Sequence, residues 1–331
     1  MPTINANNVN DAYANALWSL SIDSNWIESD SRNGKVRKFI EPVLTKYRYP
    51  HERVLFDPVR DANPFLHLFE ALWMLNGGND VIFPAQFTKQ FLEYSDDGVT
   101  LHGAYGHRWR NHFGHDQLDS AIYELATNPS SRRVVIGMWD PYIDDHVGYA
   151  GGKDVPCNSH VYFNVKDKEL DMTVCNRSND LVWGCYGANA VHMSILHEYM
   201  ALSSGIPIGS YYQFSNDLHL YETHFKFLGK PPKDEEVDDH YATGRVAHQP
   251  LFRAPSERGA FDQDVQDFVE NPMQNLFRTT FMKDTAGPMY RAWKYFKNGL
   301  LESALNTARQ IEATDWRKAS VEWIERRVPK S

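Results

Sequence analysis

The sequence has 331 residues, of which 42% are hydrophobic and 13% aromatic, and its formal net charge is −9. This composition excludes an intrinsically disordered chain and supplies enough apolar surface for a sizeable core. The negative charge argues against a general nucleic-acid binder, which would present a clustered basic face, but local arginines could still bind a small anionic substrate.

Cysteine usage and hydropathy indicate a soluble cytoplasmic protein. The three cysteines are an odd number, and no apolar segment of the signal-peptide kind begins the chain, which favours a reducing compartment. No run approaches the roughly 20 apolar residues that cross a membrane. Metal binding is not expected, because His192 and His197 are five residues apart on a predicted helix and no C-x-x-C motif is present. A glycine-rich phosphate loop of the Walker type is also absent from the sequence.

The first hundred residues contain one strongly specified helix. Residues 30–34 (DSRNG) carry a turn signal that includes Arg32. An asparagine–proline pair then predicts the start of a helix over residues 65–76, which ends before a pair of glycines. The helix is apolar almost all round, so Glu70 is expected in an apolar setting. A carboxyl group there either has a raised pKa that serves a function or pairs with an arginine.

Aromatic residues between 80 and 100 have the spacing of a helix, and Tyr105 follows them. Arg132 and Arg133 then begin a predicted strand over residues 134–139. Adjacent residues of a strand point to opposite faces. The two arginines could therefore bind one phosphate together only at an unusual junction.

The most informative stretch surrounds Cys157. This cysteine directly follows a proline and precedes an alternating run, residues 160–165, that predicts a strand. A second predicted strand, residues 169–175, ends just before Arg177. The cysteine and the arginine could therefore lie side by side, and a guanidinium beside a thiol favours the nucleophilic thiolate. The alternative is that Cys157 is a small apolar core residue.

Further elements follow Cys157 and frame three polar residues. Asn189 opens a predicted helix and could be no more than its N-cap. His219 and Tyr221 are two residues apart and so share one face of a strand. Residues 231–240 are rich in proline and acidic side chains and predict an exposed loop. The remaining predicted elements are a helix over 117–127, a loop over 181–188, a helix over 189–204, a strand over 208–214 and helical structure over 289–327.

Six short motifs follow one another in the order, and at roughly the spacing, of the thymidylate synthase family. The motifs are EALW at 70–73, YGHRWR at 105–110, SRR at 131–133, PC at 156–157, RSND at 177–180 and DLHLY at 217–221. The sequence from about residue 30 to residue 225 therefore resembles that family.

This resemblance implies the fold and the domain organisation. We expect an α+β fold of the thymidylate synthase type, in which a large mixed sheet is flanked by helices and packs at a homodimer interface. One catalytic domain would span residues 1–331. Within it we expect a variable loop or extension at about 230–262 and a helical C-terminal region at about 289–327.

The resemblance also implies the site residues and the substrates. The substrates would be a pyrimidine nucleoside monophosphate and 5,10-methylenetetrahydrofolate, with no metal, no membrane and no nucleic acid involved. The catalytic set would be the nucleophile Cys157, the proton-relay residue Glu70, Tyr105, and Asp180, which would hold the folate pterin. The nucleotide would be bound by Arg32, Arg132, Arg133, Arg177 and Ser178 at the phosphate, by Asn189 at the base, and by His219 and Tyr221 at the sugar. Arg132 and Arg133 would be supplied across the dimer interface.

Two departures from the family predict which reaction is catalysed. Phe91 falls near a position where thymidylate-forming members carry tryptophan, and residues 327–331 (RVPKS) replace their apolar C-terminal tail. Both features in the family help to exclude water from a reactive intermediate. We therefore predict the hydroxymethylase branch, known from viruses and antibiotic pathways, in which water quenches an exocyclic methylene. Thymidylate synthase itself, which quenches with hydride, is the alternative.

The spacing between two site residues predicts which pyrimidine base the substrate carries. Asp180 and Asn189 are nine residues apart, one more than in the family pattern, which indicates a remodelled base pocket. A uracil enzyme would not need that change, so dCMP is preferred, with dUMP a close second. Ser178 fits a deoxy sugar. A minor alternative is an idle nucleotide- or RNA-binding regulator, which would be expected to lack Cys157 or Glu70.

Overall fold

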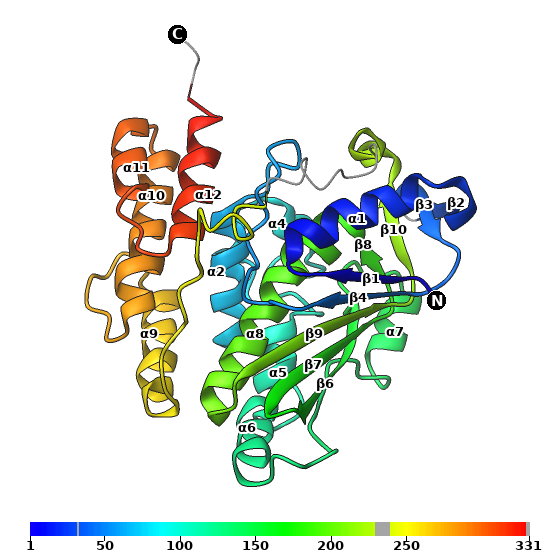
Figure 1. Ribbon diagram of the computed structural model, residues 1–331, viewed down its shortest axis with the longest axis horizontal. Coiled ribbons are helices and arrows are strands. Elements are labelled where there is room, and N and C mark those ends of the chain that lie inside the picture. The colour runs from blue at the N-terminus through cyan, green and yellow to red at the C-terminus, as the bar shows by residue number, and fades with distance from the viewer. Residues whose placement is uncertain (32, 229–238, 329–331) are drawn as a thin grey trace.

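A mixed sheet of six strands forms the centre of the protein (Figure 1). The computed structural model describes residues 1–31, 33–228 and 239–328. The strand order is β1-β4-β9-β7-β6-β5; β1 runs parallel to β4 and β7 parallel to β9, and the other pairs are antiparallel. The strands are β1 (Thr3–Ala6), β4 (Val43–Tyr47), β5 (Val135–Gly137), β6 (Asn158–Lys166), β7 (Glu169–Asn176) and β9 (Ile208–Ser215). The predicted α+β class with a mixed sheet is confirmed.

The two faces of this sheet have different environments. Along β4, Val43, Thr45 and Tyr47 are buried, whereas the residues between them are partly exposed. The same alternation runs through β7 and β9. Helices α1 (Val9–Ser21) and α8 (Asn189–Ser204) cover the buried face. Among the described residues no helix packs on the other face, which stays partly open in this single chain.

Two helices of the core follow from local signals in the sequence. The Asn63 side chain accepts hydrogen bonds from the backbone N of Phe65 and Leu66, and proline occupies the first turn of α2 (Pro64–Leu75). The helix α8 ends at Gly205, whose φ of 71° suits glycine. All residues of α2 except Glu70 are buried, so the carboxyl group of Glu70 lies at the one partly open position of an apolar helix.

A second, smaller sheet brings distant polar residues together. Its strand order is β2-β3-β10-β8, and β10 runs parallel to β8, which places His219 opposite Asp180. On its other side β10 pairs with β3, with Tyr221 opposite Val36. The turn between β2 and β3 carries Arg32, which lies outside the described residues. The strands are β2 (Trp26–Ser31), β3 (Gly34–Phe39), β8 (Asn179–Asp180) and β10 (Leu218–Tyr221).

Short helices connect these sheets, and two predictions about this region are wrong in detail. Residues 181–188, predicted as a loop, form a π-helical turn that kinks at Gly187 and leads directly into α8. Arg132 and Arg133 precede β5 rather than beginning it. The short helices are α3 (Ile82–Ala85), α4 (Gln90–Tyr94), α5 (Tyr105–Arg110), α6 (Gln117–Thr127) and α7 (Asp144–Tyr149), with 3₁₀ turns at Asp23–Asn25, Glu222–Phe227 and Pro255–Glu257.

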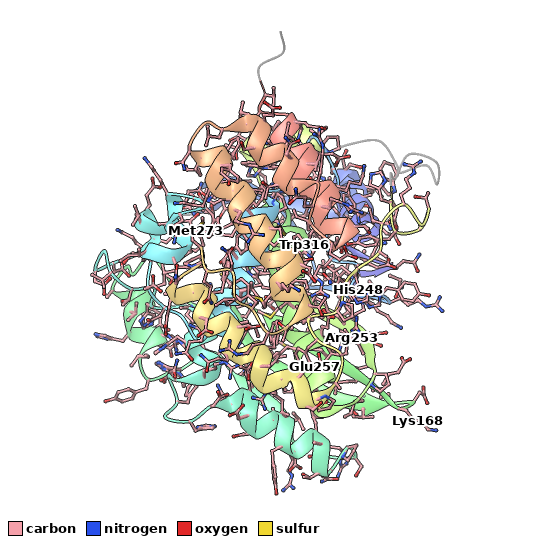
Figure 2. The ribbon with its side chains drawn as sticks, turned by 90° about the vertical axis from the view of Figure 1, so that its left-hand side faces the viewer. Lys168, His248, Arg253, Glu257, Met273 and Trp316 are labelled. Carbon is pink, nitrogen blue, oxygen red and sulfur yellow. The ribbon has the colours of Figure 1, made fainter. Side chains whose placement is uncertain are left out.

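The C-terminal part adds a helical layer against α2. Phe69 of α2 stacks on Phe268 at a centroid distance of 5.3 Å, and Phe65 packs against Trp293 at 5.4 Å. Figure 2 turns this layer toward the viewer, with Trp316 labelled on its last helix. The layer comprises α9 (Arg258–Glu270), a π-helical turn (Met282–Ala286), α10 (Gly287–Lys297), α11 (Leu301–Ala308) and α12 (Thr314–Glu325). Helical structure therefore begins about thirty residues before the predicted 289–327 region.

Of the segment predicted as an exposed loop over residues 231–240, the structure describes only the last two residues. Residues 229–238 lie outside the described part of the chain, but Asp239 and His240 are buried. Asp239 Oδ2 accepts a hydrogen bond of 2.6 Å from Asn8 Nδ2, and the hydroxyl of Tyr241 donates to Asp315 Oδ2 at 2.9 Å. These buried polar contacts join the N-terminus of the chain, the segment and the C-terminal helices.

Candidate active site

Cys157 lies immediately before β6, and Arg177 forms hydrogen bonds with the residues that lead to it. The backbone N of Arg177 donates to Cys157 O at 2.9 Å, and its side chain donates to Pro156 O and Val155 O at 2.8 and 2.9 Å. Its Nη2 lies 3.9 Å from Cys157 Sγ. The predicted neighbourhood of the thiol and the guanidinium is confirmed as geometry, and the positive charge favours the thiolate. Arg177 remains exposed and so can also reach a ligand.

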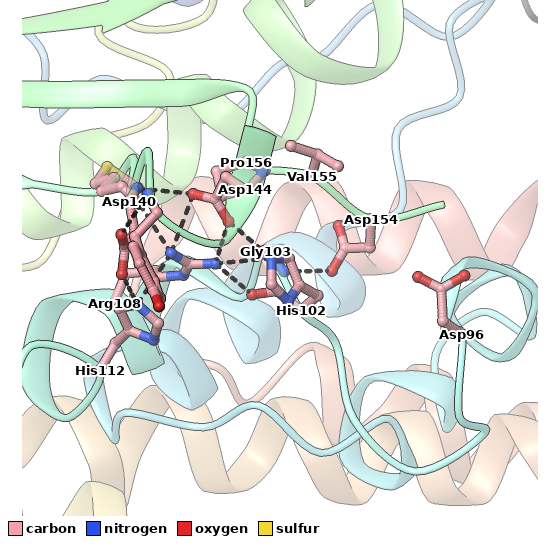
Figure 3. A network of polar contacts seen from close by, with 12 residues as sticks. Asp96, His102, Gly103, Arg108, His112, Asp140, Asp144, Asp154, Val155 and Pro156 are labelled. Atoms are coloured by element: carbon pink, nitrogen blue, oxygen red, sulfur yellow. Dashed lines mark hydrogen bonds and ion pairs between the residues drawn. The ribbon is translucent and has the colours of Figure 1, made fainter. Parts of the chain in front are cut away.

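A buried ion pair holds the chain that leads to Cys157 (Figure 3). Arg108 of α5 and Asp144 of α7 have no exposed side-chain surface, and their two hydrogen bonds measure 2.7 and 3.1 Å. His102 Nε2 also contacts Asp144 Oδ1, at 2.7 Å. Farther along, Asp154 Oδ2 accepts from the backbone N of Gly103 at 2.8 Å. The residues between α7 and Cys157 are thus tied at both ends to the turn that begins α5.

Glu70 of α2 contacts a histidine rather than an arginine. His192 Nε2 lies 3.4 Å from Glu70 Oε2, and 16% of the Glu70 side chain is exposed. Burial, and then the charge of Asp154, raises the pKa of Glu70 to about 8. Burial lowers the pKa of His192 to about 3. At neutral pH the contact therefore joins a protonated carboxyl group to a neutral imidazole, and it is not an ion pair.

Tyr105 forms hydrogen bonds with the backbone at the nucleophile, and Asn158 follows the nucleophile in the chain. Burial, and then the charges of Cys157 and Asp154, raises the pKa of the Tyr105 hydroxyl well above its usual value, while hydrogen bonds with the backbone of Asn158 and Cys157 oppose this. The hydroxyl is therefore protonated beside the sulfur. The amide of Asn158 is fully buried, and neither of its polar atoms has a hydrogen-bond partner among the described residues. Such an orphaned amide indicates a place for a polar ligand atom.

Asp180 lies at the end of β8, and only one of its two carboxylate oxygens accepts a hydrogen bond from a described residue. Its Oδ1 accepts from the backbone N of Trp183, whereas its Oδ2 is buried with no partner among the described residues. Trp183 is 46% exposed, and the Arg60 guanidinium lies 4.4 Å from its ring centroid. A buried acceptor beside a partly open aromatic wall fits a flat ring that carries N–H donors, as a pterin does.

The residues predicted for the base and the sugar come from neighbouring elements. Asn189 Nδ2 donates to Asn179 Oδ1 at 3.2 Å, so its side chain is held by β8 and does not cap α8. His219 Nδ1 lies 3.1 Å from Asp217 Oδ1, and the rings of His219 and Tyr221 meet edge to face at 5.2 Å. Because His219 also lies opposite Asp180, this small sheet gathers the predicted sugar and pterin residues. Ser178 is partly buried next to Arg177.

The two paired arginines lie apart from these residues. Arg132 and Arg133 are both exposed, and the Arg133 guanidinium lies 3.7 Å from Glu124 of α6, with 84% of its side chain exposed. Their segment leads into β5, the edge strand of the large sheet. Within one chain these arginines therefore do not join Arg177. Arg32, the remaining predicted phosphate ligand, lies outside the described residues.

Four residues of this region were not predicted from the sequence, namely Tyr94, Asp154, Asn158 and His192. Burial, and then the charges of Glu93, Tyr221, Asp180 and Glu70, raises the pKa of Tyr94. Three of the four have a sequence signal: Asn158 directly follows the proline–cysteine pair, Asp154 lies two residues before it, and His192 lies three residues after Asn189 on the same helix. Tyr94 has none beyond its aromatic spacing.

In the described part of the chain, no helix combines the length and the apolar character of a membrane span. The same residues contain no cluster of three or more histidine, cysteine, aspartate or glutamate side chains arranged to hold a metal ion.

Comparison with known proteins agrees with this geometry. The family model described as thymidylate synthase matches residues 30–236. A deoxyuridylate hydroxymethyltransferase of Pseudomonas phage M6 is 46% identical over 99% of this chain and 95% of its own length. One from Bacillus phage SP01 is 38% identical over 57% of this chain and 51% of its own. A thymidylate synthase of Francisella philomiragia is 26% identical over 60% of this chain and 73% of its own. The chain belongs to the thymidylate synthase family.

Proposed function

We propose that this protein is a pyrimidine deoxynucleotide C5-hydroxymethyltransferase. The main support is similarity to a phage deoxyuridylate hydroxymethyltransferase, which is 46% identical along nearly the whole of both chains. The site supports the same reading, because Arg177 stands beside the Cys157 thiol and a protonated Glu70 lies close by. The departure near Phe91 favours water over hydride as the quenching group.

In the proposed mechanism, Cys157 adds as a thiolate to C6 of the base, which turns C5 into a nucleophilic, enolate-like carbon. Methylenetetrahydrofolate, when bound, supplies the one-carbon unit. Asp180 Oδ2, an orphaned acceptor, would receive a pterin N–H. Glu70 transfers protons to and from the pyrimidine ring, and the Tyr105 hydroxyl stays protonated beside the sulfur of Cys157. Phosphate would be bound by Arg32, Arg132, Arg133, Arg177 and Ser178, and the sugar by His219 and Tyr221.

For the base, we propose uracil, and we keep cytosine as the second candidate. A protonated Glu70 is a hydrogen-bond donor, which suits the carbonyl O4 of uracil, whereas the 4-amino group of cytosine needs an acceptor. The amide of Asn189, held by Asn179, would read the base edge. The relatives from Pseudomonas phage M6 and Bacillus phage SP01 also carry deoxyuridylate in their names. The extra residue before Asn189 is the observation that favours dCMP.

The experiment that tests this function identifies both products. The protein is incubated with dUMP or with dCMP plus methylenetetrahydrofolate in isotope-labelled water, and the nucleotide is analysed by mass spectrometry. We expect a hydroxymethyl group that carries solvent oxygen, and tetrahydrofolate as the folate product. Dihydrofolate formation matched to nucleotide consumed would instead establish thymidylate synthase activity.

We also propose a homodimer in which each site is completed by its partner. The supporting observations are the face of the large sheet on which no described helix packs and the exposed Arg132 and Arg133, which lie apart from Arg177 within one chain. Because cyclic dimers are the commonest soluble assemblies and use one patch twice, an exposed arginine pair at the sheet edge can serve the partner site.

Mixing two inactive variants tests this sharing. A Cys157→Ala chain and an Arg133→Ala chain each form defective homodimers, but a heterodimer has one site with both residues intact. After subunit exchange we expect recovery of about a quarter of parental activity, since half of the dimers are mixed and half of their sites are whole. The matched control mixes Cys157→Ala with Glu70→Ala, which share one chain's site and should give no recovery. No recovery in the first mixture, despite proven exchange, would contradict shared sites.

A further inference from the structure

Asp154 is a partly buried carboxylate three residues before Cys157, and the family resemblance gives it no role. Its Oδ2 accepts a hydrogen bond of 2.8 Å from the backbone N of Gly103 (Figure 3). The packing there is tight: a Cβ on Gly103 would come within 3.0 Å of Pro156 N and 3.1 Å of Asp154 Oδ1. This contact fixes the carboxylate between the nucleophile loop, residues 154–157, and the turn that precedes Tyr105.

Asp154 also acts electrostatically on two groups of the site. Burial, and then the charge of Asp154, raises the pKa of Glu70. Burial, and then the charges of Cys157 and Asp154, raises the pKa of Tyr105. The Asp154 carboxylate therefore acts on the Glu70 carboxyl group and on the Tyr105 hydroxyl, which also forms hydrogen bonds with the backbone of Cys157 and Asn158.

The surroundings of the two carboxyl groups assign them different protonation states. Burial raises the pKa of Asp154, and Asp96 adds to this, but a backbone amide, His102 and Arg108 favour its charged form. Burial and Asp154 are the influences on Glu70, and both disfavour its charged form. Two neighbouring carboxylates tend to retain one proton between them. That proton therefore resides on Glu70, and Asp154 remains ionised.

Hydroxymethylation requires one more base than methylation. The attacking water must lose a proton as its oxygen bonds to carbon, whereas a hydride brings its own electron pair and needs no base. Glu70, which holds its proton up to a pKa of about 8, is a poor acceptor at neutral pH. An ionised carboxylate beside the nucleophile loop is the group suited to this transfer.

We propose that Asp154 is the base that deprotonates the water attacking the exocyclic methylene of the nucleotide, an inference that rests on the hydroxymethylase function proposed above. The water gives one proton to the Asp154 carboxylate, and its oxygen forms a bond to the methylene carbon. The π pair of the exocyclic double bond moves into the ring as an enolate. That pair then forms the C5=C6 bond as the C6–S bond breaks, and Cys157 leaves as a thiolate. The step needs no oxidant or reductant.

Asp154→Asn tests the proposal, because its amide oxygen can still accept from Gly103 but cannot take up a proton. We expect hydroxymethyl formation to fall by about 10²- to 10⁴-fold, whereas folate-dependent tritium release from C5 of dUMP, measured in a single turnover, stays within roughly threefold. A small thiol such as 2-mercaptoethanol attacks as its thiolate and needs no base, so a thioether of the nucleotide should accumulate with this variant. The matched control is Asp96→Asn, which removes an exposed carboxylate that binds the backbone N of Lys153. Because the charge of Asp96 raises the pKa of Asp154, its loss favours the ionised form of Asp154, and both rates at neutral pH should stay within about twofold of the parent.

The pH profile supplies a readout that a structural role would not change. The parent rate should fall at acid pH as Asp154 becomes protonated, and in Asp154→Asn this acid limb should be replaced by a rate that rises with hydroxide. Hydroxymethyl formation within tenfold of the parent, or an equal loss of tritium release, would overturn the inference. If Asp154→Asn does not fold, Asp154→Glu provides the test. The rate of this variant should still fall at acid pH, but with a midpoint different from that of the parent. An unchanged midpoint would overturn the proposal. A parent that yields a methyl group and dihydrofolate removes the water step and overturns the proposed function as well.

Discussion

Cys157→Ser is expected to lower turnover by about 10⁴-fold or more, because an alcohol beside Arg177 is a far weaker nucleophile than a thiolate. Nucleotide binding should survive, since the serine leaves the hydrogen bonds of Arg177 to Val155 O and Pro156 O unchanged. Turnover is measured as hydroxymethyl nucleotide formed, and binding by equilibrium titration with dUMP.

Cys175→Ser is a matched control for this variant. Cys175 lies on β7 and is partly buried, and burial raises the pKa of its thiol, so it is no alternative nucleophile. This control should retain activity close to that of the parent. Turnover of Cys157→Ser within tenfold of the parent would exclude a covalent mechanism through this residue.

Elements with strong local signals could be predicted from the sequence alone. The helix α2 has a side-chain cap from Asn63 and an unbroken apolar surface, and α8 ends at a glycine with positive φ. The strands β6 and β7 alternate in burial as their sequences alternate in polarity. The contact between Cys157 and Arg177 follows from this pairing, because their residues lie at adjacent ends of neighbouring strands.

Other features depend on tertiary contacts that leave no local mark. Residues 181–188 are an apolar run without periodicity, so nothing in them distinguishes a π-helical turn from a loop. Asp239 lies in a segment with the composition of an exposed loop, yet it is buried. Its carboxylate accepts a hydrogen bond from Asn8, which is more than two hundred residues away in the chain. His192 meets Glu70 only because α2 and α8 pack together. The effect of Asp154 on Glu70 likewise requires the fold.

Glu70→Gln is expected to lower product formation by about 10²- to 10⁴-fold, because the amide imitates the protonated carboxyl group but cannot transfer a proton. The shape and the hydrogen-bond donor are retained, so dUMP should bind about as well as it does to the parent. The measurement pairs single-turnover rates with binding titrations. A variant that binds poorly but turns over normally when saturated would assign Glu70 to binding rather than to proton transfer.

The same variant has an expected signature in stability. The folded-state pKa of Glu70, about 8, lies above its ordinary value of 4.5, so the folded protein holds this proton more tightly than the unfolded chain does. The resulting stabilisation is fully present below the ordinary value and is lost as pH rises through about 8. At about 1.4 kcal/mol per pKa unit its upper limit is about 5 kcal/mol, which coupling to Asp154 reduces. Glu70→Gln has no carboxyl group to ionise, so its urea midpoint should fall less than the parent's as pH is raised from neutral to alkaline values. Parallel pH–stability curves for the two proteins would contradict a raised pKa for Glu70.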